Sequence, residues 1–169
     1  METEAISLAV VMQRLPLASR WQAYQWRAAE VTAAPLPTGA PRCLHDDEQD
    51  LRWLFTGFAV SLYSDEAEGY FLNLGSAQPC WFVMSRMETI DGLEVAVPRH
   101  LTLSYNEAAR LMDAGEQVDT VAAEGPFIER MAVFVNAHYR PEVKHKRRKP
   151  SFEGGAAVAR MAKEEGRGR

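Results

Sequence analysis

The pattern of hydrophobic and polar residues predicts a chain built mainly of β-strands. Apolar side chains alternate with small or polar ones from Ile6 to Val11 and again from Leu93 to Val97. This period of two residues is typical of strands that bury one face. An unbroken apolar run from Cys80 to Met84 predicts a strand that is covered on both faces.

The stretch from Ser61 to Arg86 is predicted to be a meander around which the rest of the chain packs. We expect one strand to end near Ser61, followed by a hairpin loop at Asp65–Gly69 with a positive φ at Gly69. A second strand is expected at Tyr70–Leu74. The turn sequence Gly75–Pro79 then leads into the third, fully apolar strand.

Two further strands are predicted around aromatic residues. The segment Arg20–Val31 alternates with period two, and its alanines leave a helix as the competing interpretation. The segment Leu51–Tyr63 contains Gly57, which indicates a bulge, a bend or a close approach by another side chain. Pro16 and Pro98 are expected to interrupt strands, because proline cannot donate to a ladder.

The last third of the chain changes to helical patterns. A capping box at Ser104 and Glu107 predicts a short helix that ends before Gly115. Val118–Ala122 is compatible with a short strand. Apolar residues at spacings of three and four then predict a longer helix between Pro126 and Pro141. A strong turn signal, Asp91-Gly92, predicts a hairpin earlier in the chain.

Together these elements predict a single α+β domain over residues 1–141. Its sheet is expected to be antiparallel and partly barrel-like, with about six or seven strands, and to be followed by a C-terminal helical segment. Residues 142–169 are expected to form a flexible basic tail, because their composition cannot bury enough apolar area to offset ordering.

Charge separates these two parts and bears on partners. Residues 1–139 carry 9 Arg, no Lys and 19 acidic residues, while residues 140–169 carry 10 basic and 4 acidic residues. The two cysteines, Cys43 and Cys80, lie far apart without a paired spacing, which indicates a reducing compartment. No apolar segment is long enough to span a bilayer, so a cytoplasmic location is expected.

Sequence motifs for catalysis are absent. The glycines form no phosphate-binding loop, and no serine lies in a nucleophile elbow. None of the four histidines pairs with another histidine or a cysteine at a metal-ligand spacing. We therefore assign no catalytic, cofactor or metal residues and do not expect an enzyme.

Tryptophan and arginine residues give the strongest candidate for a binding surface, because these residue types dominate interface hot spots. The alternative is a core of aromatic rings with arginine stems along its rim. The basic run in the tail could contact an acidic protein, an anionic membrane surface or nucleic acid, and the acidic body disfavours nucleic acid. The candidate interaction residues are Arg20, Trp21, Trp26, Arg27, Trp81, Arg86, Lys144, Lys146, Arg147, Arg148 and Lys149. We expect any site where the strand of Trp81 and Arg86 approaches residues 21–27.

Five segments in order resemble a bacterial family of uncharacterised function. They are Val10–Gln22 with Trp26, Asp65–Leu74, Trp81–Arg86, Ser104–Glu116, and His138–Glu142 with Lys146–Phe152. The genes of that family accompany molybdenum-dependent formate dehydrogenase operons. The resemblance implies a role in assembly or operation of that enzyme, and it supplies no catalytic residues.

The sequence thus leaves two functional hypotheses. The first is a non-enzymatic accessory protein that aids maturation or assembly of a molybdenum-dependent formate dehydrogenase through contacts with its subunits or maturation factors. The alternative is a small-molecule protein, either a binder of a cofactor precursor or an enzyme, that uses a Trp/Arg-lined cleft in the mouth of the barrel.

Overall fold

The structure is a computed structural model that describes residues 3–34 and 38–143. Within these residues, seven strands form two antiparallel sheets. The four-stranded sheet has the order β2-β1-β4-β3 and contains β1 (Ile6–Pro16), β2 (Tyr24–Ala33), β3 (Arg42–Asp46) and β4 (Leu51–Val60). The three-stranded sheet has the order β6-β5-β7 and contains β5 (Cys80–Ile90), β6 (Leu93–Thr102) and β7 (Gln117–Ala122).

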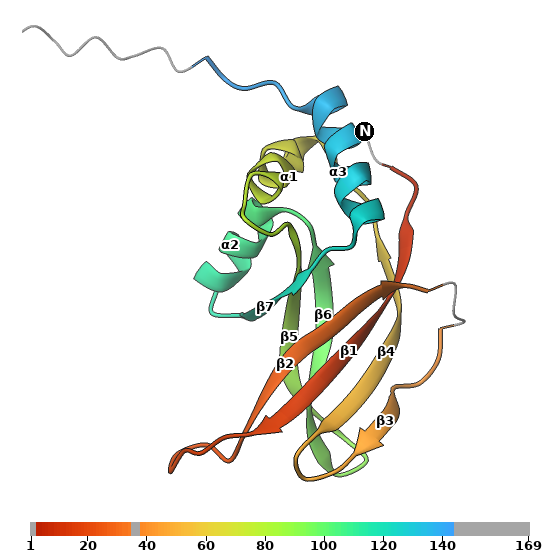
Figure 1. Cartoon of the computed structure of the whole chain (residues 1–169), viewed down its shortest axis with the longest axis vertical. Helices are drawn as coiled ribbons and strands as arrows, with labels where there is room; N and C mark the ends of the chain where they lie inside the picture. The colour runs from red at the N-terminus through yellow and green to blue at the C-terminus, as the bar shows by residue number, and fades with distance from the viewer. Residues whose placement is uncertain (1–2, 35–37, 144–169) are drawn as a thin grey trace, which may run out of the picture.

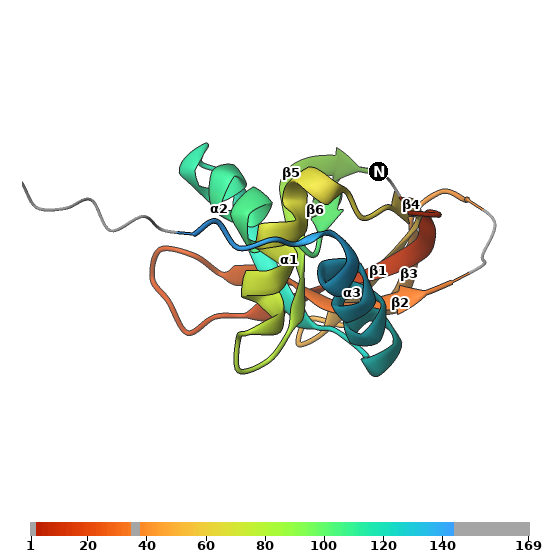
Figure 2. The ribbon, with the colours of Figure 1, turned by 90° about the horizontal axis from the view of Figure 1, so that it is seen from above.

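The helices gather at one end of the two sheets, which we call the helical end (Figures 1 and 2). They are the 3-10 turn η1 (Ser64–Glu66) and the α-helices α1 (Ala67–Leu74), α2 (Tyr105–Asp113) and α3 (Gly125–His138). At the opposite end lie the β1–β2 connection and the β5–β6 hairpin (Figure 1). We call this the hairpin end.

The two sheets share one hydrophobic core and together form a sandwich. Leu8, Val10 and Met12 of β1 alternate into this core, as do Trp81 and Val83 of β5. At the helical end the core continues between α1 and α3 through Tyr70, Phe127, Met131 and Phe134. Burial of these side chains is the main favourable contribution to folding.

The predicted partly barrel-like sheet is corrected to two separate sheets. No strand ladder joins them within the described residues, so the barrel is not closed. Their edges approach instead, with β2 beside β7 and β4 beside β6. The backbone N–H of Ala28 on β2 donates to Asp119 Oδ2 on β7 at 3.0 Å, which links the two edges through a side chain.

Most of the predicted elements are confirmed. Residues 24–33 form a strand and not a helix, and residues 81–85 of β5 are buried as expected for a strand covered on both faces. Asp91 and Gly92 form the hairpin turn, both with positive φ. Gly57 has a φ of +89°, and a Cβ there would lie 2.7 Å from Thr38 Cγ2, which explains why glycine occupies this bulge.

The prediction of a central meander from Ser61 to Arg86 is wrong for its middle element. Residues 67–74 form the helix α1 and not a hairpin loop followed by a strand. Ala67, Tyr70 and Asn73 recur at spacings of three and are buried, whereas Glu68, Phe71 and Leu72 are exposed. A helical period is therefore present, and the acidic residues before it suit a helix N-terminus.

Gly69 serves a different purpose from the one predicted. It lies inside α1 and is not among the residues with positive φ. A Cβ at this position would lie only 2.0 Å from Ser104 Oγ, at the start of α2. The glycine is needed because α1 and the N-terminus of α2 pack in contact.

Of the two interruptions expected at prolines, one is confirmed and the other is wrong. β1 ends at Pro16, which pairs with Tyr24 at the end of the ladder. β6 continues through Pro98, because β6 is an edge strand and its pairing with β5 shifts register there. Proline is tolerated at such edge and bulge positions. The predicted basic tail lies outside the described residues from Lys144 onward.

Candidate functional site

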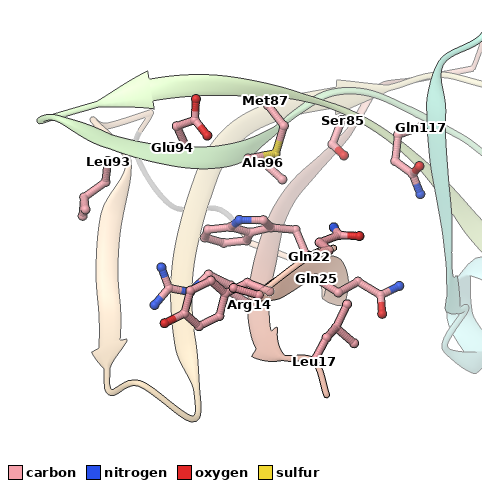
Figure 3. Close-up of a pocket in the computed structure, with 13 residues that line it drawn as sticks. Arg14, Leu17, Gln22, Gln25, Ser85, Met87, Leu93, Glu94, Ala96 and Gln117 are labelled. Atoms are coloured by element: carbon pink, nitrogen blue, oxygen red, sulfur yellow. The ribbon is translucent and has the colours of Figure 1, made fainter. Parts of the chain in front are cut away.

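A cleft of about 780 Å³ opens between the two sheets at the hairpin end. One wall is formed by the end of β1 and the start of β2, and the other by the β5–β6 hairpin (Figure 3). Gln117, the first residue of β7, stands at one end of the cleft and Leu93 at the other (Figure 3). Its lining residues are Arg14, Leu17, Gln22, Ala23, Tyr24, Gln25, Trp26, Ser85, Met87, Leu93, Glu94, Ala96 and Gln117.

Exposed apolar side chains surround this cleft on both sides. Leu17 and Tyr24 contribute from the β1–β2 side, while Met87 and Leu93 contribute from the hairpin. Met87 is 54% exposed, although residues 81–85 of the same strand are buried. Clustered apolar side chains left in contact with water are typical of interaction sites.

Arg14 gives the cleft a cationic group. Its guanidinium carbon lies 4.0 Å from the centre of the Tyr24 ring, a cation–π contact that fixes the side chain. Its Nε atom is buried and has no hydrogen-bond partner among the described residues. A carboxylate entering the cleft would supply the missing acceptor.

The predicted site residues fall into three different environments. Trp26 is half-buried and lines the cleft, while Arg20 and Trp21 lie in the exposed β1–β2 connection, where Trp21 is 94% exposed. Trp81 is completely buried, with its ring packed edge-on against Phe127 at a centroid distance of 5.2 Å. Its side chain therefore belongs to the core alternative and cannot contact a partner.

Arg27 is held by a polar network outside the cleft. Its Nε and one terminal nitrogen donate to Gln13 Oε1 at 3.0 and 2.8 Å, and Gln13 in turn donates to Asp50. Hydrogen bonds from Arg52 and then from Gln13 lower the pKa of Asp50. The network ties β2, β1 and β4 together on the sheet.

Arg86 does not line the cleft either, because it forms an ion pair with Glu116. It donates to both carboxylate oxygens of Glu116, at 3.1 and 2.5 Å. The hydrogen bond from Arg86 lowers the pKa of Glu116. Because Glu116 directly precedes β7, this pair fixes the point at which β7 begins beside β5. Of the predicted residues, Lys144, Lys146, Arg147, Arg148 and Lys149 lie outside the described part of the chain.

A second, more polar hollow of about 410 Å³ lies between β4, β6 and the N-termini of α1 and α2. His100 Nε2 lies 2.7 Å from Glu107 Oε1, and this contact raises the pKa of His100 and lowers that of Glu107. Burial raises the pKa of Tyr70 to about 12, so its hydroxyl stays protonated and accepts from the Tyr63 N–H. The arrangement secures the start of α2.

The described residues form neither a reactive cysteine site nor a metal site. Burial raises the pKa of Cys80, which disfavours the thiolate that a nucleophile needs. No group of three or more His, Cys, Asp or Glu side chains in the described ranges could hold a metal ion. No helix in those ranges combines the length and the apolar character that crossing a membrane requires.

Residues of the two strands between which a site was expected, β2 and β5, line the cleft: Tyr24, Gln25 and Trp26 from β2, and Ser85 and Met87 from β5. The apolar rim residues Leu17, Tyr24, Met87 and Leu93 are not among the predicted tryptophan and arginine residues. A signal was available at Met87 and Leu93. Both are large apolar residues beside charged neighbours near the Asp91-Gly92 hairpin turn, where a sandwich has few residues to cover them.

Fold and site together define a small α+β protein with an open cleft between two antiparallel sheets. The chain belongs to a family described as protein of unknown function, DUF3305, whose sequence pattern matches residues 7–148. Neither a curated protein nor a solved structure matches the chain.

Proposed function

We propose that the chain is a non-enzymatic accessory protein that binds a protein partner in the cleft at the hairpin end. The observation that carries this proposal is the set of exposed apolar side chains facing each other across the cleft: Leu17, Tyr24, Met87 and Leu93. Leaving such residues in water costs free energy, and a partner that covers them would recover it.

The choice of partner follows from the resemblance of the sequence to proteins whose genes accompany molybdenum-dependent formate dehydrogenases. We propose that a subunit of such an enzyme, or one of its maturation factors, enters the cleft during assembly in the cytoplasm. The side chains of the cleft suit holding a polypeptide, since apolar and amide groups predominate and Arg14 and Glu94 are its charged members.

Affinity capture tests the proposal. The full chain is immobilised and exposed to the purified dehydrogenase subunits and maturation factors, one at a time. The double variant Tyr24→Ser/Met87→Ser should reduce capture by roughly tenfold or more, since loss of central apolar contacts costs about 2 kcal/mol. Leu44→Ser is the matched control, because Leu44 is 47% exposed on β3 and does not line the cleft.

The cellular readout is formate oxidation. A deletion strain should lose most of this activity, and the Leu44→Ser gene should restore it while the double variant should not. Failure to capture any of these proteins, together with normal formate oxidation in the deletion strain, would reject the proposal.

A second candidate is binding of a small anionic molecule. The cleft volume lies within the usual range for ligand sites, and the cationic side chain of Arg14 lines it. Trp26 also lines the cleft, so tryptophan fluorescence would report binding. Saturable quenching by a molybdopterin nucleotide that Arg14→Met abolishes would favour this candidate over a protein partner.

A further inference from the structure

The cleft lies in the continuation of β7. β7 pairs with β5 from Cys80 to Ser85, where Ser85 lies opposite Gln117. β5 then runs on to Ile90, and over this half it pairs with β6 alone. One edge of β5 is therefore left without a neighbouring strand in the described residues, and Ser85 and Met87, where this edge begins, point into the cleft (Figure 3).

Hydrogen bonding identifies the backbone groups of β5 that face this edge. The N–H of Ala123 donates to the carbonyl of Pro79 at 2.9 Å, so the backbone of Pro79 faces β7. In an antiparallel strand, the residues that face a given neighbour alternate. Counting by twos from Pro79 reaches Ser85, which is still opposite β7, and then Met87 and Thr89, which face the open edge beyond β7.

The edge of β2 across the cleft carries a matching set of groups. The N–H of Leu17 donates to the carbonyl of Ala23 at 2.8 Å, so the backbone of Ala23 faces β1, while Tyr24, Trp26 and Ala28 face outward. The outward N–H of Ala28 is already satisfied by Asp119 of β7. The next outward groups, those of Trp26 and Tyr24, adjoin the cleft, and all of residues 22–26 line it, as a strand seen edge-on would.

We propose that the cleft accepts an extended segment of the partner protein as an added strand that continues β7 between β5 and β2. This mode of binding rests on the proposed function and specifies what the partner must offer. Main-chain hydrogen bonds to Met87 and Thr89 would give affinity, as in other cases where a peptide adds a strand to an exposed sheet edge.

Side chains in the cleft define the sequence of that segment. Alternate residues of the added strand would point inward, where they meet Trp26, Met87 and Ala96. The segment should therefore carry apolar residues at every second position. Because Arg14 has a buried Nε without a partner, one inward position should be Asp or Glu.

A single strand of another protein fits better than the other possible occupants. The open edge of β5 is bordered by the outward backbone groups of Tyr24 and Trp26 on β2, so a single strand could meet both edges at once. The chain's own C-terminal part leaves from the end of α3, at the helical end and opposite the cleft (Figure 1).

The test is selection of random peptides of about ten residues, the length of a long strand, displayed on phage against the full chain. Selected peptides should alternate apolar and polar residues and include an acidic residue. Thr89→Pro removes an N–H that faces the open edge of β5 and not β6, so the fold should survive. It should weaken binding of a selected synthetic peptide roughly tenfold or more, because an acceptor is left unpaired.

Thr89→Val is the matched control, since it keeps the backbone N–H and should bind as tightly as the wild type. Thermal unfolding of both variants checks that they are folded. Equal affinity of the two variants for the peptide would overturn the proposal. So would selected peptides with apolar residues at spacings of three and four, which indicate a bound helix.

Two further outcomes would identify another occupant and overturn the proposal. Slow hydrogen exchange at the amides of Met87 and Thr89 in the free monomer would mean that the chain covers its own edge. A dimer that Thr89→Pro dissociates would mean that a second copy does so. If partner capture needs Tyr24 and Met87 but is unchanged by Thr89→Pro, the proposed function stands and the added strand is rejected.

Discussion

At the helical end of the sandwich the polar side chains of Asn73 and Ser104 are buried and hydrogen-bonded, whereas at the hairpin end apolar side chains are exposed. Asn73 is 1% exposed and Ser104 is fully buried, and both make several hydrogen bonds. At the other end Met87 and Leu93 are 54% and 46% exposed. The two sheets are thus covered at the helical end and partly uncovered at the hairpin end.

This difference indicates that the helical end contributes more to the stability of the fold than the hairpin end does. Buried polar groups cost free energy unless every partner is present, so the helical end tolerates only one arrangement. β7 begins only at Gln117, opposite Ser85, and no described strand pairs with β5 from Arg86 to Ile90 on that edge. Substitutions should therefore affect folding at the helical end and binding at the hairpin end.

The largest effect on folding is expected for Asn73→Ala. Asn73 Nδ2 donates to the carbonyls of Cys80 and Leu103, both at 2.8 Å, and its Oδ1 accepts from the Cys80 N–H at 3.0 Å. The substitution would leave these groups without a partner in the core. The free energy of unfolding should fall by about 3 kcal/mol, given ~1–3 kcal/mol for each buried group left unsatisfied.

Urea denaturation followed by tryptophan fluorescence measures this loss. Asn106→Ala is the control, because Asn106 makes one exposed hydrogen bond, to Glu68 at 3.2 Å. Its effect should stay within about 0.5 kcal/mol. Equal effects of the two substitutions would show that the Asn73 network does not hold the helical end together.

The strands could be predicted from sequence wherever one local signal decided the structure. The alternation after Ile6 and the Asp91-Gly92 turn each determine an element through neighbouring residues, and both are confirmed. The helix after Pro126 is confirmed for the same reason. By contrast, the division into two sheets depends on which strand edges meet, and no local pattern reports that.

Helix α1 shows how two periods can compete within a short segment. Tyr70 to Leu74 contains adjacent apolar residues, which fit a strand, and the helix appears only when Ala67 is counted with Tyr70 and Asn73. A glycine can indicate either a turn with positive φ or a close approach by another side chain, and the sequence alone does not show which applies to Gly69. Here it provides space for Ser104, a residue that lies far along the chain.

The composition of the cleft could not be predicted from the sequence. Residues 22–26 line it opposite Ser85 and Met87, but Trp21, Arg27, Trp81 and Arg86 do not line it. The exposure of Met87 depends on where β7 begins, and the Arg86–Glu116 pair marks that point. Because this is a long-range contact, the pattern within β5 gives no indication that its second half has an open edge.

A smaller effect is expected from the His100–Glu107 pair, which secures α2 at the helical end. Contact with Glu107 raises the pKa of His100, so its contribution to stability is complete below the ordinary pKa of about 6.5 and is lost as pH rises through the folded value. The lowered pKa of Glu107 gives a contribution that is lost as pH falls below about 4.3. The pair should therefore stabilise the fold most between about pH 4.5 and 6.5.

Glu107→Gln should reduce the free energy of unfolding by a few tenths of a kcal/mol near pH 5.5, since both side chains are partly exposed, and by less near pH 8.5. Nuclear magnetic resonance titration should show the pKa of His100 falling in the variant. Glu68→Gln, on the exposed face of α1, serves as the control. An unchanged pKa of His100 would contradict the assigned cause.

The smallest effect on folding is expected for Met87→Ser, at the hairpin end. Met87 is 54% exposed, so the free energy of unfolding should change by no more than about 0.5 kcal/mol. Met84, on the same strand, is 7% exposed and lies outside the main core cluster, and Met84→Ser should cost about 2 kcal/mol because it removes a packed side chain. Denaturation of the two variants in parallel compares the covered and open halves of β5 with the same chemical change. Similar losses from both would show that Met87 contributes to the core, and the proposed division between a stabilising end and a binding end would then fail.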